Sequence, residues 1–153
     1  MSRICSRLCA TATRLNYILR PYLNDVAEAI DRQAHGHEVT VKPLNIVVIT
    51  DGVHSDDVEG VIVHAAKKLD SYNVESWQVG IQFFQVGREP GAAENLAKLY
   101  DALSGIYNIR DMVDTVPWSG QELTAQMLLK VCLGSVVRRQ LKPGTFPSKA
   151  TKS

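Results

Sequence analysis

The chain has 153 residues, of which 45% are hydrophobic and 22% are charged, and its formal net charge is +1 at pH 7. This length and composition predict one globular domain that is large enough to bury a core. The near-neutral charge gives no electrostatic reason to expect a nucleic-acid partner. No apolar run approaches the roughly 20 residues that cross a bilayer, so we expect no membrane partner either.

The cysteines indicate the redox state of the compartment in which the protein is expected. Their number is odd, at three, and their spacing indicates no disulfide framework. We therefore expect a reducing, cytoplasmic environment. Residues 1–24 contain several arginines but no acidic residue. That bias is also typical of mitochondrial transit peptides, so a mitochondrial location is the alternative.

The first part of the chain predicts a helix, a strand and a second helix. Apolar residues recur at helical spacing from Leu15 to Ile30, and Pro21 should kink the early part of that helix. The short apolar run from Leu44 to Thr50 predicts a strand buried on both faces. Another helical stripe runs from Val58 to Leu69, with Ser55 expected as its N-cap.

The second part of the chain continues the alternation. A strand is expected from Trp77 to Val86, and a turn over Gly87–Gly91 leads into a helix that carries Leu96 to Leu103. A short strand follows from Met112 to Val116. A last helix carries apolar residues from Leu123 to Cys132, where the thiol is expected to be buried. Strands that alternate with helices predict βαβ units and a parallel sheet, so the fold class is α/β.

Three residues are expected along the edge where the parallel strands end, which is where α/β proteins bind their ligands. Asp51 follows the first strand, Arg88 the second and Trp118 the third. Asp51 with Gly52 is either part of a site or only the turn that ends the strand. Trp118 is either a contact for a protein partner or a lid over the sheet. Arg88 is a further candidate for partner contact.

Three segments together resemble the von Willebrand factor type A (vWA) family, in particular its small stand-alone members that are common in fungi. They are residues 47–52 (VVITDG), 77–87 (WQVGIQFFQVG) and 109–118 (IRDMVDTVPW). The similarity implies a vWA-like domain over residues 11–141. We expect the N-terminal segment over residues 1–10 and the polar tail over residues 142–153 to be disordered.

The resemblance implies a Rossmann-like three-layer sandwich with a mainly parallel sheet and a metal-ion-dependent adhesion site. In that site three loops hold a divalent cation, usually Mg²⁺, and an acidic group of a protein partner completes the coordination. Asp51 matches the aspartate of the third loop. In the second loop Cys9 stands where the family usually has a threonine, and Thr11 is close by. The Asp-x-Ser-x-Ser of the first loop occurs nowhere in the chain, so we expect a domain that lacks the family's early strands.

The missing first loop changes the expected function. Mg²⁺ prefers six oxygen ligands in octahedral geometry, and Asp51 with a lone threonine such as Thr11 supplies too few. We therefore expect a degenerate site that binds metal weakly or not at all, and a protein-binding function without catalysis. The alternative is a phosphate-ester hydrolase or a nucleotide-binding protein that uses Asp51. Against a hydrolase, Ile49 stands where such enzymes carry their nucleophilic aspartate.

Without the early strands, the strand from Leu44 to Thr50 would lie at an edge of the sheet. Its centre, Ile46–Ile49, is apolar and uncharged, and only Lys42 and Pro43 protect its start. We therefore expect self-association through this edge, or a partner that donates a strand to it.

Overall fold

Three parallel strands form the centre of the fold. The computed structural model describes residues 10–52, 56–117, 120, 124–129 and 132–133. Within them the strands are β1 (Leu44–Thr50), β2 (Val79–Gln85) and β3 (Val113–Val116), in the order β1-β2-β3. All neighbours pair in parallel, and the pairing of β1 with β2 is in register over the full length of both strands. The predicted α/β class and parallel sheet are therefore confirmed.

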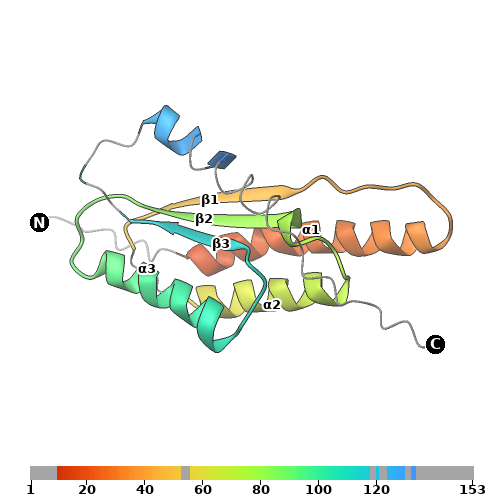
Figure 1. Ribbon diagram of the computed structural model, residues 1–153, viewed down its shortest axis with the longest axis horizontal. Coiled ribbons are helices and arrows are strands. Elements are labelled where there is room, and N and C mark those ends of the chain that lie inside the picture. The colour runs from red at the N-terminus through yellow and green to blue at the C-terminus, as the bar shows by residue number, and fades with distance from the viewer. Residues whose placement is uncertain (1–9, 53–55, 118–119, 121–123, 130–131, 134–153) are drawn as a thin grey trace, which may run out of the picture.

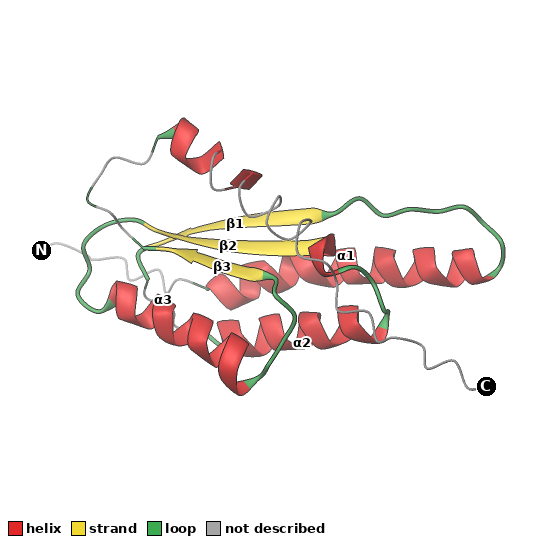
Figure 2. Cartoon of the chain, viewed as in Figure 1, coloured by secondary structure: helices red, strands yellow, loops and turns green. Residues whose placement is uncertain are grey.

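Three helices cover one face of this sheet: α1 (Thr11–Ala34), α2 (Val58–Ser71) and α3 (Ala92–Asp101). Figure 1 shows all three below the strands, with α2 and α3 each following a strand as in a βαβ unit, and Figure 2 marks the same elements by type. The core between sheet and helices is built mainly from aliphatic side chains, with Phe83 and Met112, and includes Leu15, Leu19, Ile62, Leu69 and Ile81. Burial of each such side chain contributes roughly 1.5–3 kcal/mol.

The strand that is buried on both faces is β2, not β1. All residues of β2, the central strand, are buried. In β1 the side chains alternate, and those on the face away from the helices are open to solvent. Asn45 is exposed and 54% of Ile49 is accessible. The prediction that β1 is buried on both faces was wrong, because β1 lies at an edge of the described sheet.

The helix boundaries differ from the prediction in two places. The helix α1 extends beyond the predicted stripe at both ends and contains Pro21, whose ring lies on the exposed side. The N-cap of α2 is Asp57, whose carboxylate accepts a hydrogen bond of 2.8 Å from the backbone N–H of Gly60. The prediction of Ser55 as this cap was therefore wrong, and Ser55 itself lies outside the described residues.

The second strand begins two residues later than predicted. Residues Ser76–Gln78 form a short 3₁₀ turn (η1) before β2. The side chain of Gln78 donates hydrogen bonds to the hydroxyl of Tyr22 at 2.7 Å and to the carbonyl of Val41 at 3.0 Å. The Tyr22 hydroxyl in turn donates to the carbonyl of Lys42 at 2.7 Å. These bonds attach α1 to the segments that precede β1 and β2, and they favour the turn over continued strand.

The C-terminal part of the domain is described only in pieces. The helix α3 ends in a π-helical turn, η2 (Ala102–Ile106), and β3 begins one residue later than predicted. Residues 125–129 and 132–133 are helical, as expected for the last helix. Cys132, predicted to be buried, is only partly buried. Residues 1–9, Trp118, and the tail over residues 142–153 lie outside the described residues. Within the described part of the chain, no helix is both long enough and apolar enough to cross a membrane.

Candidate functional site

Hydrogen bonds to Thr50 join the carboxyl end of β1 to that of β2 and shape the turn after β1. Its carbonyl accepts from the backbone N–H of Val86 at 2.8 Å, and its hydroxyl accepts from the N–H of Gly52 at 3.0 Å. Gly52 has a φ of +86° and packs against the first residue of α3, Ala92. A Cβ atom at Gly52 would lie 2.5 Å from that of Ala92. The sharp turn after β1 therefore requires glycine.

Asp51 stands at this turn with an exposed side chain. The strand before it is held by its pairing with β2, and the glycine after it is fixed against α3. The side-chain amide of Asn95 also lies 3.4 Å from the carbonyl of Gly52. Hydrogen bonds and packing therefore hold Thr50 and Gly52 on either side of Asp51, whose carboxylate lies at the end of the sheet.

Asp56, five residues further on, connects the loop after β1 to the start of α1. Its carboxylate accepts a hydrogen bond of 3.1 Å from the backbone N–H of Thr13 and lies 3.5 Å from the hydroxyl of the same residue. The N-cap position of α1 is Ala10, which offers no side-chain acceptor, and the first turn of this helix contains no acidic residue. Asp56 therefore acts as the N-cap of a helix that lies 43 residues away in sequence.

This contact favours the ionised form of Asp56. Desolvation by itself would raise the pKa of the carboxyl group. Hydrogen bonds from the backbone of Ala12, Thr13 and Asp56 itself, together with the Thr13 hydroxyl, outweigh that effect and hold the pKa below its ordinary value. The positive end of the α1 dipole acts in the same direction.

A groove of about 460 Å³ opens beside this contact, between the first turns of α1 and α2. Its lining includes the polar residues Thr13, Asn16, Asp56, Asp57 and His64, together with the apolar surface of Ala12 and Val61. We call the surface formed by Asp51, Asp56, Asp57 and the first turn of α1 (residues 11–13) the carboxyl rim. It combines exposed carboxylates with a fixed backbone and an adjacent hollow.

The predicted site residues are distributed as follows. Asp51 is exposed in the rim, whereas Thr11 is buried in the first turn of α1, with only 5% of its surface accessible. The contact between Asp56 and Thr13 brings the segments that carry these two residues together. Arg88 is exposed in the loop after β2, at the same end of the sheet. Trp118 lies outside the described residues.

The described residues do not fit a resident Mg²⁺ ion. Asp56 is already engaged by the start of α1, and the side chain of Thr11 is buried. In the ranges that the structure describes, no three side chains of histidine, cysteine, aspartate or glutamate gather as metal ligands. Mg²⁺ is normally anchored by one or two carboxylates together with further oxygen ligands. Asp51 supplies a single carboxylate, without those further ligands from the residues that the structure describes.

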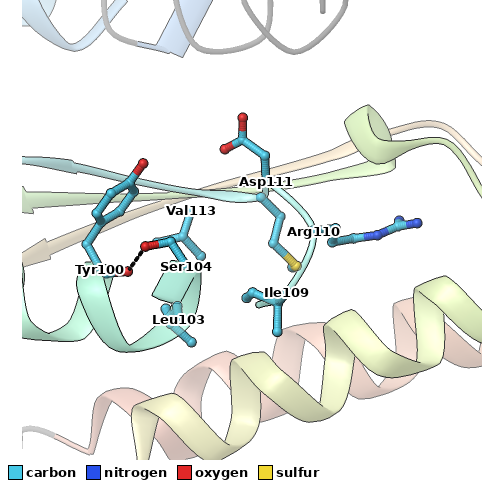
Figure 3. Close-up of a pocket in the computed structure, with 8 residues that line it drawn as sticks. Tyr100, Leu103, Ser104, Ile109, Arg110, Asp111 and Val113 are labelled. Carbon is cyan, nitrogen blue, oxygen red and sulfur yellow. Dashed lines mark hydrogen bonds between the residues drawn. The ribbon is translucent and has the colours of Figure 1, made fainter. Parts of the chain in front are cut away.

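A second hollow, of about 230 Å³, lies at the opposite end of the sheet (Figure 3). It is lined mainly by Tyr100, Leu103, Ile109, Arg110 and Asp111. Arg110 points away from the hollow in Figure 3, and its guanidinium donates hydrogen bonds to Asp70 in α2 and to the carbonyls of Val74 and Glu75 in the segment after α2. The cation at this hollow therefore has a structural role, and the carboxyl rim is the better candidate site.

The role of Asp56 was missed by reasoning from the sequence, which assigned it to the start of α2. One signal could have indicated it: the first turn of α1 has neither an acidic residue nor a capping side chain at residue 10, so its acceptor had to come from elsewhere.

The chain matches no family model, no curated protein and no solved structure.

Proposed function

We propose that this chain is a vWA-like protein-binding domain that contacts its partner through the carboxyl rim and performs no catalysis. The observation that supports this most is the bond between Asp56 and Thr13, which holds Asp56, directly before the N-cap of α2, against the start of α1. Because the rim is fixed before a partner arrives, little conformational entropy is lost on binding.

The chemistry of the rim indicates what its partner offers. Asp51 and Asp57 are exposed, and Asp57 uses one carboxylate oxygen as the cap of α2. Ionised carboxylates accept hydrogen bonds, and their strongest partners are arginine and lysine side chains. We therefore propose a direct contact with a basic group of the partner, instead of the metal-bridged contact to an acidic group that the vWA resemblance implies. Arg88 is a second point of contact at the same end of the sheet.

The alternative of a phosphate-ester hydrolase or nucleotide-binding protein has less support. Ile49 and Asp51 lie on either side of Thr50, so the nucleophile position of such hydrolases holds an aliphatic side chain. Asp51 alone could serve only as a general acid or base.

Site-specific photo-crosslinking in cells tests the proposal. A photoreactive amino acid is placed at Asn16, which lines the groove beside the rim, or at Asn24, which is exposed two turns further along α1. The proposal expects a reproducible crosslinked protein at Asn16, reduced by Asp51→Ala and absent at Asn24. Equal crosslinking at both positions that Asp51→Ala does not change would contradict it.

A further inference from the structure

The outer edge of β1 carries a row of backbone hydrogen-bonding groups. The carbonyl of Thr50 accepts from Val86, so Thr50 directs its backbone groups toward β2. Successive residues of a strand alternate in this direction. Asn45, Val47 and Ile49 therefore direct their N–H and C=O groups away from β2. No strand among the described residues pairs with them there.

This edge lacks the features that usually prevent strand pairing. Natural edge strands are protected by charged side chains, prolines or bulges. No charged residue occurs from Pro43 to Thr50, and Pro43 lies before the strand. The pairing with β2 is continuous, so β1 contains no bulge. Ile49 adds an apolar side chain that is 54% exposed.

We propose that β1 pairs with β1 of a second copy of this chain, antiparallel and about a two-fold axis at Val47. A two-fold axis makes the same surface serve both partners. In this register Val47 lies opposite Val47 of the second copy, and Asn45 lies opposite Ile49. Each of these pairs exchanges both backbone hydrogen bonds, and two β-branched valines meet at the centre.

The charges at the two ends of β1 favour antiparallel pairing with a second copy over pairing with a strand of another protein. Lys42 precedes the strand and Asp51 follows it, and both side chains are exposed. The antiparallel register centred on Val47 puts Lys42 of each copy at the same end of the strand pair as Asp51 of the other, so unlike charges attract there at low salt. A parallel alignment would instead place like charges together. The edge is therefore complementary to itself, both in its backbone groups and in its charges.

The expected dimer is weak. A pair of short strands buries less than the roughly 1,200–2,000 Å² of a standard stable interface. We therefore expect a dissociation constant of about 10–100 μM, at which monomer and dimer both occur at accessible concentrations. The proposed dimer shares Asp51 with the carboxyl rim, but the backbone of β1 and Lys42 lie outside the rim, so amide protection at Val47 and Ile49 and the Lys42 variant test the dimer separately from the proposed function.

Sedimentation velocity and amide hydrogen exchange test the dimer. The full chain should shift from monomer to dimer between about 1 and 500 μM. Over the same range the amides of Val47 and Ile49 should become protected, whereas the amide of Val48, which points toward β2, should be protected throughout. A monomer at every concentration, or amides at Val47 and Ile49 that are already protected in the monomer, would overturn the proposal.

A charge swap tests the register. Lys42→Glu and Asp51→Lys should each raise the dissociation constant about tenfold at low salt, because each reversal turns two attractive pairs into two repulsive ones. The double variant Lys42→Glu/Asp51→Lys should bind within about threefold of the original chain. Lys67→Glu makes the same charge change at an exposed position on α2 and should have no effect. Equal effects of Lys42→Glu and Lys67→Glu, or a double variant as weak as the single ones, would overturn the register.

Discussion

Replacement of Gly52 by alanine tests how tightly the turn after β1 is packed. Two separate costs are expected. The φ of +86° lies in the left-handed region, where an L-residue with a Cβ is disfavoured by about 1–2 kcal/mol. The new Cβ would also lie 2.5 Å from the Cβ and 2.8 Å from the Cα of Ala92. Unstrained carbon atoms approach only to about 3.5–4.0 Å, so the start of α3 would have to move.

The size of the effect follows from adding these costs. Overpacking in a filled site costs about 1–3 kcal/mol, so Gly52→Ala should lower the free energy of unfolding by about 2–5 kcal/mol in total. For a chain of this length that corresponds to a fall in Tm of roughly 5–15 °C. Such a loss is a large part of the about 5–15 kcal/mol that stabilises a typical domain.

Gly87 provides a matched control. Its φ is +84°, but a Cβ built there would have no neighbour within 4 Å. Gly87→Ala should therefore show only the backbone cost of about 1–2 kcal/mol, and the difference between the two variants isolates the contact with Ala92. Urea unfolding with an unchanged m-value measures both. Ala92→Gly in the Gly52→Ala background should recover part of the loss. If Gly52→Ala costs no more than Gly87→Ala, the argument for close packing at this turn is refuted.

The remaining predictions concern the rim and the structural cation. Asp56→Ala removes the acceptor of the Thr13 N–H and should lower the free energy of unfolding by about 1 kcal/mol, the usual contribution of an N-cap. Since the pKa of Asp56 in the folded chain is held below its ordinary value of 3.8, this difference should be complete above that pH. The two unfolding curves should converge as the pH falls through the folded pKa. Arg110→Met removes the donor to Asp70 and to the carbonyls of Val74 and Glu75, so it should cost about 2–3 kcal/mol in urea unfolding; a loss no larger than that of exposed Arg88→Met would contradict this. Asp51→Ala should change stability by less than ~1 kcal/mol, and a loss of several kcal/mol would show that Asp51 holds the fold. Calorimetry with Mg²⁺ should give a dissociation constant in about the millimolar range or weaker, and micromolar affinity that Asp51→Ala removes would contradict the ligand count.

The elements of the fold could be predicted from the sequence because their signals are local. Apolar residues at helical spacing located α1 and α2, and the β-branched run located β1 with its bounds from Leu44 to Thr50. Periodicity depends only on which side chains a helix or strand places on one face. The same pattern predicted the parallel sheet, because strands that alternate with helices need crossover connections.

Two features of the fold depended on contacts between residues that are distant in sequence. The apolar run of β1 looked like a central strand, but the pairing order places it at an edge and puts β2 in the centre. The residues Trp77 and Gln78 fit a strand pattern, yet the bonds from Gln78 to Tyr22 and Val41 favour a 3₁₀ turn. No local pattern carries this information.

Within the carboxyl rim, too, some features could be predicted from the local sequence and others depended on long-range contacts. The sequence by itself determined that Asp51 and Gly52 end a strand, because a carboxylate and a glycine after an apolar run signal a turn. Only the tertiary structure decided that Gly52 must be glycine because Ala92 lies against it, and that Asp56 serves a helix 43 residues away. Turn chemistry is a property of neighbouring residues. Which backbone donor a carboxylate satisfies depends on how the helices pack, and packing is settled only when the whole chain folds.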